Sequence, residues 1–434
     1  MAHRKWLMAA VVAGLVGGCA EREVILQGDR QELRGEPPQV ELPSESRSIR
    51  LAAQTRNANW THRHGTQKYR TAHPALSTAP ALAWTANIGA GDGRRQRIAT
   101  DPVVFDGRIF TIDSEAQLTA TGTEGQRLWA HDMTPAGDKS SEASGGGLAV
   151  GEGKLFVSNG FGRLSAFDPA TGALLWEQRL GATGSGAPTV YGGLVYVISG
   201  DDLAWALDTE TGRIEWQLSS TPDVNNLMVP SAPSVTDKFV IFGFGSGEVQ
   251  AAFRKGGLRF WDAGVQGGRV GRALSSISDI SGDPVVVGNT IYVANHSGRL
   301  VSLDADTGTR NWTIEQGALS PVWPAGDSLF LVNEQNQLLR VSAATGEVIW
   351  GKRLPDFVKE RPRRQVRRYG QYGPVLAGGV LWIASSAGTL NAYDPASGDL
   401  LRSEALPHGA ASNPVVAGGT LYVVNKKGEL LAFR

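Results

Sequence analysis

A pattern that ends in tryptophan recurs along most of the chain and restricts the possible folds more than any other feature. Its best copies have the form Ala/Ser-x-Asp-x-x-Thr-Gly-x-x-x-Trp. The clearest copies end at Trp176, Trp216 and Trp312, and weaker ones end at Trp129, Trp261, Trp350 and, without the tryptophan, Arg402. A repeat of about 40–50 residues is typical of architectures in which each unit buries its core only against its neighbours.

Each repeat predicts four short antiparallel strands. Residues 103–112 read Val-Val-Phe-Asp-Gly-Arg-Ile-Phe-Thr-Ile, which is two strands around an Asp-Gly hairpin turn. In the Asp-x-x-Thr-Gly turn that follows the third strand, the Asp caps backbone N–H groups and the Gly supplies positive φ. The fourth strand carries the Trp, which we expect to wedge between neighbouring sheets opposite a small Ala or Ser. Such a unit is one propeller blade.

The two ends of this repeat region complete each other. Residues 412–434 supply three strands without a fourth, and residues 82–88 supply a single strand that carries Trp84. We predict that this N-terminal strand joins the C-terminal blade and closes the ring, which removes the exposed sheet edge. The sequence therefore predicts an all-β, eight-bladed β-propeller over residues 80–434. Seven blades or an open solenoid are the alternatives.

Residues 1–18 predict a lipoprotein signal peptide. A short positive stretch precedes the apolar run Trp6–Val16, which is too short to span a bilayer as a helix. Gly17 and Gly18 then precede Cys19, the single cysteine of the chain. We expect cleavage before Cys19 and its acylation, because several acyl chains anchor a protein stably. Ala20, where an Asp often marks inner-membrane retention, favours the periplasmic face of the outer membrane. A secretory signal with a chance cysteine is the alternative.

Residues 19–79 predict a lipidated, flexible tether. They hold few apolar runs and many charged residues and prolines, a composition that buries little surface. The last part contains His62 and His64, but no further ligand follows at a convincing spacing, so we predict no metal site. The alternative for this part is an extended segment on the surface of the main domain.

The composition excludes several classes of function. Lys and Arg total 42, as do Asp and Glu, so the net charge of zero gives no general basic footprint for nucleic acid. One cysteine excludes an intramolecular disulfide, a Cys-based zinc site and an iron–sulfur cluster.

One loop departs from this charge balance. Between the sixth and seventh repeats, residues 352–368 hold only Asp356 and Glu360 as acids. A solvated surface loop is one interpretation, and a contact with anionic lipid or an acidic partner is the other. The basic residues of the loop are Lys352, Arg353, Lys359, Arg361, Arg363, Arg364, Arg367 and Arg368.

The tryptophan pattern resembles the docking motif of pyrroloquinoline-quinone (PQQ) propellers. Two classes carry it: the quinoprotein alcohol dehydrogenases, and the BamB family of lipoproteins in the outer-membrane β-barrel assembly (Bam) machinery. From Cys19 to Arg434 the chain is similar to the BamB family in its lipoprotein signal, blade count and closing strand, and in residues 274–287. This resemblance implies a non-catalytic periplasmic scaffold that docks on the POTRA domains of BamA, with other Bam components, and assists the folding and insertion of outer membrane proteins.

The quinoprotein alternative implies features that the sequence does not offer. Such dehydrogenases use two adjacent cysteines against the cofactor, a bound Ca²⁺ and a catalytic Asp, whereas this chain has one cysteine. Asp304 and Asp306, which resemble part of a calcium loop, belong to one copy of the repeated turn. We therefore expect no enzymatic activity, cofactor or metal. A propeller that binds another envelope protein or a small ligand stays open as the alternative.

The family resemblance also implies where the partner binds, on loops between the middle blades. Asn225, Leu227 and Met228 fall in the first loop, where Leu227 matches an apolar residue and Met228 stands where well-studied members carry Arg. Asp279 matches the first acidic residue of the second loop, and Ser281 replaces the second. Ordinary loop packing is the alternative role for each residue.

Overall fold

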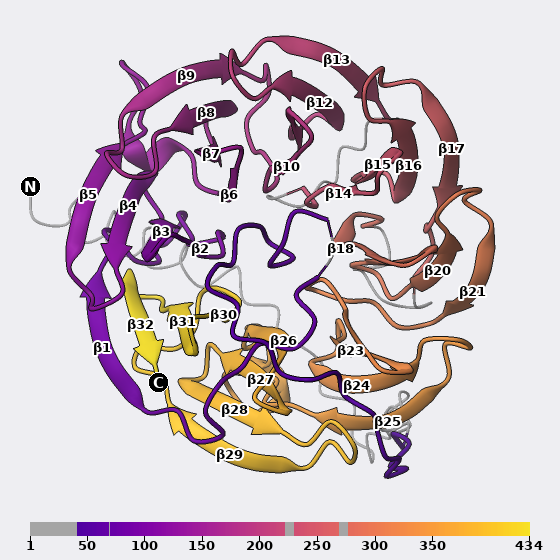
Figure 1. Cartoon of the computed structure of the whole chain (residues 1–434). Coiled ribbons are helices and arrows are strands. Elements are labelled where there is room, and N and C mark those ends of the chain that lie inside the picture. The colour runs from indigo at the N-terminus through magenta and orange to yellow at the C-terminus, as the bar shows by residue number, and fades with distance from the viewer. Residues whose placement is uncertain (1–40, 69, 222–229, 269–276) are drawn as a thin grey trace, which may run out of the picture. The chain divides into compact units, whose positions relative to one another are not determined.

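A computed structural model describes residues 41–434, apart from residue 69, residues 222–229 and residues 269–276. By internal contacts, Leu42–Arg434 form one compact unit. The predicted signal peptide and Cys19 lie outside the described residues. In the described part, thirty-two strands form eight four-stranded antiparallel sheets arranged as a ring (Figure 1). The predicted all-β, eight-bladed propeller is therefore confirmed.

The blades are numbered here in chain order, each from its inner to its outer strand. Blades 1 to 4 are β2–β5 (Val103–Phe105, Arg108–Ile112, Gln117–Gly122, Arg127–Asp132), β6–β9 (Gly146–Gly151, Lys154–Asn159, Arg163–Phe167, Leu174–Arg179), β10–β13 (Thr189–Tyr191, Leu194–Ile198, Leu203–Asp208, Ile214–Ser219) and β14–β17 (Ser234–Val235, Phe239–Gly243, Glu248–Phe253, Arg259–Gly264). Blades 5 to 7 are β18–β21 (Ile280–Val287, Thr290–Asn295, Leu300–Asp304, Arg310–Ile314), β22–β25 (Trp323–Ala325, Ser328–Val332, Gln337–Ser342, Val348–Arg353) and β26–β29 (Gln371–Ala377, Val380–Ser385, Thr389–Tyr393, Leu400–Ala405). Two short 3₁₀ turns, η1 (Ser140–Glu142) and η3 (Pro362–Arg364), are also described. Within the described ranges, no helix is long and apolar enough to cross a membrane.

Blade 8 joins the two ends of the propeller. It consists of β30–β32 (Val415–Ala417, Thr420–Val424, Glu429–Phe433) and, as its outer strand, β1 (Leu82–Asn87). Trp84 pairs with Ala432, and backbone hydrogen bonds join Ala81 and Arg434 in both directions at 2.7 and 2.9 Å. Figure 1 shows β1 beside the C-terminal strand. The ring is thereby closed by hydrogen bonds between the N- and C-terminal strands of the unit.

The outer-strand tryptophans join each blade to the next. The Trp216 indole N–H donates to the Arg254 carbonyl in the next blade at 2.9 Å, and its ring contacts Tyr196 of its own blade. Equivalent indole N–H bonds of 2.9–3.3 Å are made by Trp84, Trp129, Trp176, Trp261, Trp312 and Trp350. Each indole thus docks on the third–fourth turn of the following blade.

The glycine of that turn is required for two reasons. Gly212 has φ of +69°, a conformation that other residues rarely adopt. A Cβ atom there would lie 2.6 Å from the Trp176 ring. Gly257 stands in the same relation to Trp216, with φ of +67° and 2.5 Å. The Thr-Gly of the repeat therefore makes both the turn and the seat for the indole.

Arg402 replaces the tryptophan at the one place where that seat does not exist. It lies on β29 of blade 7, next to blade 8. In blade 8 the third and fourth strands, β32 and β1, are the two ends of the propeller, so no third–fourth turn joins them. The Arg402 side chain instead pairs with Glu404 at 2.9 Å. Chain closure thus explains the missing tryptophan.

The antiparallel order of the strands defines two faces. Links from the outer strand of one blade to the inner strand of the next lie on one face, the connector face. First–second and third–fourth turns lie on the opposite face, the turn face. The basic loop is such a link, and the strands that flank the expected partner loops also end and begin at the connector face.

Residues 42–79 differ from the predicted flexible tether. They pack within the same unit as the propeller and cross the centre of the ring on its turn face (Figure 1). The Gly418 N–H donates to the Asn57 carbonyl at 2.8 Å, and the Gly378 N–H donates to the Pro74 carbonyl at 3.0 Å. The propeller unit therefore begins at Leu42. The composition of this segment is typical of a flexible tether, but its polar groups form hydrogen bonds with the blades.

Candidate interaction surfaces

Residues 57–64 plug the channel at the centre of the ring. Trp60 forms an antiparallel bridge with Val104 on the inner strand of blade 1, through backbone bonds of 2.7 and 2.8 Å. The Val150 N–H of blade 2 donates to the Thr61 carbonyl at 2.8 Å. The Asn57 side chain donates to the Val416 carbonyl of blade 8 at 2.6 Å. Inner strands that have no neighbour on the channel side thus find partners in this plug.

Arg63 spans the channel between opposite blades. Its Nε donates to Asp283 of blade 5 at 2.5 Å, and its Nη1 lies 3.4 Å from the Asp101 carboxylate, which precedes the inner strand of blade 1. Blades 1 and 5 lie four places apart in a ring of eight. Asp283 also accepts from the Ala232 N–H at 3.0 Å. One guanidinium therefore ties together inner segments from across the ring.

Asn413 extends this network to the remaining side of the ring. Its backbone and side-chain N–H groups donate to Asp101 at 2.8 and 2.9 Å. Its side-chain oxygen accepts from the Gly373 N–H at 2.7 Å and from the Ser320 hydroxyl at 3.1 Å. Blades 6, 7 and 8 are thereby linked to the carboxylate that faces Arg63.

Burial keeps the histidines of the plug neutral. Desolvation, together with the nearby His64, lowers the pKa of His62 to about 3. Desolvation, with Arg70 and Arg63 close by, lowers the pKa of His64 to about 3. Among the described residues, no group of three or more His, Cys, Asp or Glu is arranged to hold a metal ion.

Aromatic stacking completes the interior of the plug. The Arg70 guanidinium lies 4.4 Å from the ring centre of Trp323, and burial lowers the pKa of Arg70 to about 9. The Trp323 ring stacks on Trp60 with centroids 6.2 Å apart. The channel is therefore filled by protein side chains, a feature that the sequence reasoning missed. The adjacent Trp60, His62 and His64 were its visible signal.

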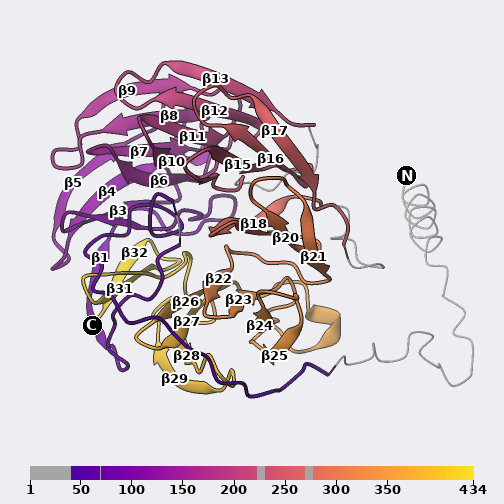
Figure 2. The ribbon, with the colours of Figure 1, turned by 45° about the vertical axis from the view of Figure 1, so that its right-hand side comes forward.

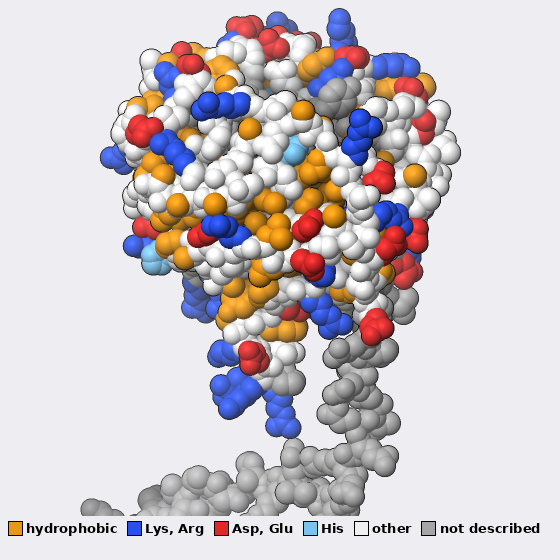
Figure 3. Space-filling view, turned by 60° about the horizontal axis from the view of Figure 1, so that its bottom comes forward, with side chains coloured by type: hydrophobic (Ala, Val, Ile, Leu, Met, Phe, Trp, Pro, Cys, Tyr) orange, Lys and Arg blue, Asp and Glu red, His pale blue; other side chains and the backbone are white. Residues whose placement is uncertain are grey.

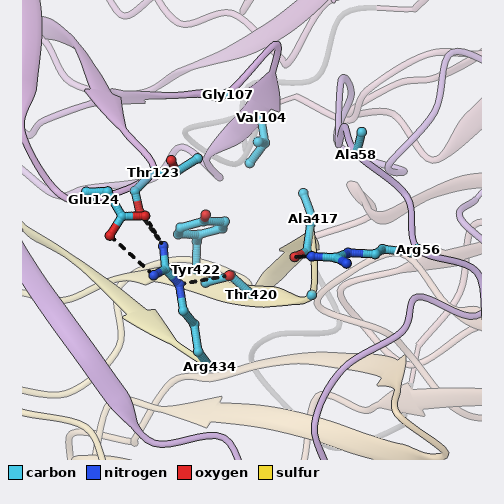
Figure 4. Close-up of a pocket in the computed structure, with 12 residues that line it drawn as sticks. Arg56, Ala58, Val104, Gly107, Thr123, Glu124, Ala417, Thr420, Tyr422 and Arg434 are labelled. Atoms are coloured by element: carbon cyan, nitrogen blue, oxygen red, sulfur yellow. Dashed lines mark hydrogen bonds and ion pairs between the residues drawn. The ribbon is translucent and has the colours of Figure 1, made fainter.

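A pocket of about 490 Å³ lies at the boundary between blades 8 and 1 (Figure 4). Arg434 reaches across it to Glu124 at 2.9 Å and to the Thr123 carbonyl at 2.5 Å. Arg56 lies on the other side, 3.5 Å from the Gly418 carbonyl. The polar groups of this pocket hold the ring closed, and its lining includes no His, Cys or Ser.

The expected partner residues are only partly described. Asn225, Leu227 and Met228 lie outside the described residues. Asp279, for which the sequence left partner binding and ordinary loop packing open, is 4% exposed. Ser281 lies on strand β18, not in a loop, and its hydroxyl donates to the Ala318 carbonyl at 2.6 Å. In this structure Asp279 and Ser281 are therefore packed against their own chain.

Comparison with known proteins gives a consistent family match. A family profile described as "Outer membrane protein assembly factor BamB" matches residues 114–352 and 360–434. The chain is 26% identical over 280 residues to an outer membrane protein assembly factor BamB of Shewanella oneidensis, covering 62% of this chain and 70% of that one. It is 22% identical over 275 residues to that of Escherichia coli, covering 62% and 70%.

Solved structures of low sequence identity share the fold. A crystal structure of BamB from Moraxella catarrhalis matches with a TM-score of 0.68 and 17% identity, covering 82% of this chain and all of that one. A quinohemoprotein alcohol dehydrogenase from Comamonas testosteroni matches with a TM-score of 0.65 and 17% identity, covering 87% and 81%. At these identities the two structures establish the propeller fold alone.

Proposed function

Because the chain belongs to the BamB family of outer membrane protein assembly factors, we propose that it is a non-catalytic scaffold of the Bam machinery that docks on the POTRA domains of BamA. The family match carries this proposal, since it covers most of the propeller. The plugged channel supports a scaffold role, because Arg63 and its two carboxylate partners occupy the centre of the ring where the inner strands converge. The loops at the rim remain as places for a partner to bind.

Cys19 would place this scaffold on the periplasmic face of the outer membrane. Acylation of Cys19 and cleavage of residues 1–18 would leave the stretch from Ala20 to Glu41 between the lipid and the propeller unit. An extended chain spans about 3.3–3.6 Å per residue, so this stretch reaches at most roughly 80 Å. The anchor would thus keep the propeller within reach of other membrane-bound components.

The connector face is the proposed docking surface. The first family loop, with Asn225, Leu227 and Met228, joins β13 to β14 on this face. We assign Leu227 as the apolar anchor, because it matches an apolar residue of the first family loop. Truncating an anchor removes far more binding energy than truncating a rim residue. The burial of Asp279 suits a role in shaping the neighbouring loop better than direct pairing with a partner.

Co-purification with the BamA homologue tests this function. The Leu227→Ala exchange should lower the affinity about thirtyfold, as expected for a residue worth about 2 kcal/mol. Leu401→Ala, an exposed leucine on the outer strand of blade 7, is the matched control and should bind as the wild type does. Failure of the wild-type chain to co-purify, or equal binding by a folded Leu227→Ala variant, would contradict the proposal.

A further inference from the structure

The link from β25 to β26 folds into a hairpin, residues 355–370, which we call the basic hairpin. Phe357 and Arg368 form an antiparallel bridge. The Val358 N–H donates to the Arg367 carbonyl at 2.9 Å, and the Tyr369 N–H donates to the Asp356 carbonyl at 2.7 Å. Figure 2 shows this link, in light orange, standing out from the ring beside β24 and β25. The hairpin thus has its own backbone pairing.

The base of the basic hairpin uses its charges to attach it to blade 6. The Arg368 Nε lies 3.1 Å from the Asp356 carboxylate, and its Nη1 donates to the Glu334 carbonyl at 2.8 Å. The Asn336 amide donates to the Tyr369 carbonyl at 2.9 Å and to Asp356 at 3.1 Å. The Arg368 guanidinium also lies 5.0 Å from the ring centre of Phe357. These contacts orient the hairpin and leave its tip to point outward.

The tip, residues 359–367, combines free cations with exposed apolar groups. It carries five cations against the single acid Glu360. In the described part of the chain, no carboxylate pairs with any of these cations. Val366 is 86% exposed, and Val358, next to the tip, is 42% exposed. Figure 3 shows several Lys and Arg side chains gathered on a projection of the surface. The five cations are Lys359, Arg361, Arg363, Arg364 and Arg367.

The first residues of the propeller unit lie beside the strand that leads into the basic hairpin. Ser44 forms an antiparallel bridge with Trp350 on β25, and the Gly351 N–H donates to the Pro43 carbonyl at 2.9 Å. Because this pairing is antiparallel, lower residue numbers run toward the C-terminal end of β25. That end leads directly into the basic hairpin. Leu42, where the propeller unit begins, therefore lies beside the base of the hairpin.

We propose that the tip of the basic hairpin binds anionic phospholipid headgroups, as a second membrane contact beside the lipid anchor. Unpaired cations around exposed valines match an interface in which charge attracts the headgroups and small apolar groups enter the acyl boundary. Only the stretch from Ala20 to Glu41 separates Leu42 from the anchored cysteine, and it reaches at most roughly 80 Å. A hairpin held this close to the anchor favours a membrane over an acidic protein as the occupant. This placement rests on the acylation of Cys19 proposed above, whereas the lipid contact itself does not.

Vesicle flotation of the unlipidated chain from Ala20 to Arg434, which keeps the whole compact unit, tests the hairpin separately from the anchor. The wild-type chain should bind vesicles that contain phosphatidylglycerol, release them as salt is raised, and ignore vesicles of phosphatidylcholine alone. Triple reversal of Arg363, Arg364 and Arg367 to Glu should lower binding about a hundredfold or more, since each charge near the surface contributes about fivefold.

A second triple reversal, Arg127→Glu with Arg213→Glu and Lys255→Glu, is the matched control. These exposed cations belong to the turn face, and their reversal changes the net charge by the same amount. The control should keep most of the binding. Equal loss in both variants, or failure of the wild-type chain to distinguish phosphatidylglycerol, would overturn the proposal and leave an acidic protein as the partner. The vesicles contain no protein, so the result does not depend on whether the BamA homologue is the docking partner.

Discussion

His62 shows how single polar groups of the plug depend on burial. The Val190 N–H donates to its Nε2 at 3.0 Å, so the ring proton lies on Nδ1 and faces the Thr61 hydroxyl at 2.9 Å. A second proton would place an N–H of the imidazolium against the N–H of Val190. Together with desolvation, this conflict opposes the charged form in the folded protein.

Stability should therefore fall as the pH is lowered. The pKa of His62 is about 3 in the folded protein, below its ordinary value of 6.5, so the unfolded chain binds the proton first. The stabilising contribution is complete above pH 6.5 and is lost progressively toward pH 3. Melting temperatures across this range should fall less steeply for His62→Gln, which keeps an acceptor without titrating. Parallel curves for the variant and the wild type would contradict this assignment.

The sequence could not reveal these roles, because the partners of the plug are far away along the chain. Val190 lies 128 positions from His62, and Asp283 lies 220 positions from Arg63. Locally the segment has the charge and proline content of a solvated tether, which is why a flexible tether was predicted. Arg340 is a similar case. It lies opposite Trp350, where most repeats have Ala, and its side chain donates to the Ser48 carbonyl at 3.2 Å. This exception in the repeat therefore indicated that residues near 48 pack on blade 6.

At the level of elements, the blades were predictable because their main contacts are encoded within each repeat. The indole of one repeat docks on the Thr-Gly turn of the next. The motif therefore predicts both the outer strand of a blade and the contact of that strand with the following blade. The Asp208 carboxylate accepts from the Thr211 hydroxyl and backbone N–H, and these bonds lower the pKa of Asp208. The turn is thereby held as the sequence indicated. Arg402 was visible as an exception, but its cause required knowledge of where the ring closes.

We expect β29, the outer strand of blade 7, to be less protected from hydrogen exchange than outer strands that carry a docked tryptophan. β29 has no docking indole, whereas β13 is held by Trp216. Hydrogen exchange should therefore be faster in β29 than in β13. Trp216→Ala should raise exchange in β13 to a similar level and lower the free energy of unfolding by about 2–3 kcal/mol, somewhat less than a fully buried tryptophan. Equal protection of β29 and β13 in the wild-type chain would show that the indole is not what secures an outer strand.

At the scale of the whole molecule, the plug changes how the ring is held. A propeller closed only by β1 and β32 depends on one seam inside blade 8, next to which Arg434 pairs with Glu124 of blade 1. Arg63 adds a bond across the diameter, from blade 1 to blade 5. Opening the seam would then require the plug to leave the channel as well. Closure is therefore a property of residues 57–64 together with the terminal strands.

Replacing Arg63 by Met should therefore destabilise the whole propeller and not one blade. Asp101 and Asp283 would keep their charges in a mostly buried site, and breaking a buried pair from one side costs about 3–5 kcal/mol. A single cooperative melting transition at lower temperature is expected. Adding Asp283→Asn should recover part of the loss, because it removes one of the uncompensated charges. Arg47→Met, which removes an exposed pair with Glu45, is the control and should melt as the wild type does. An unchanged melting temperature for Arg63→Met would mean that the β1–β32 seam and the docked indoles hold the ring without the plug.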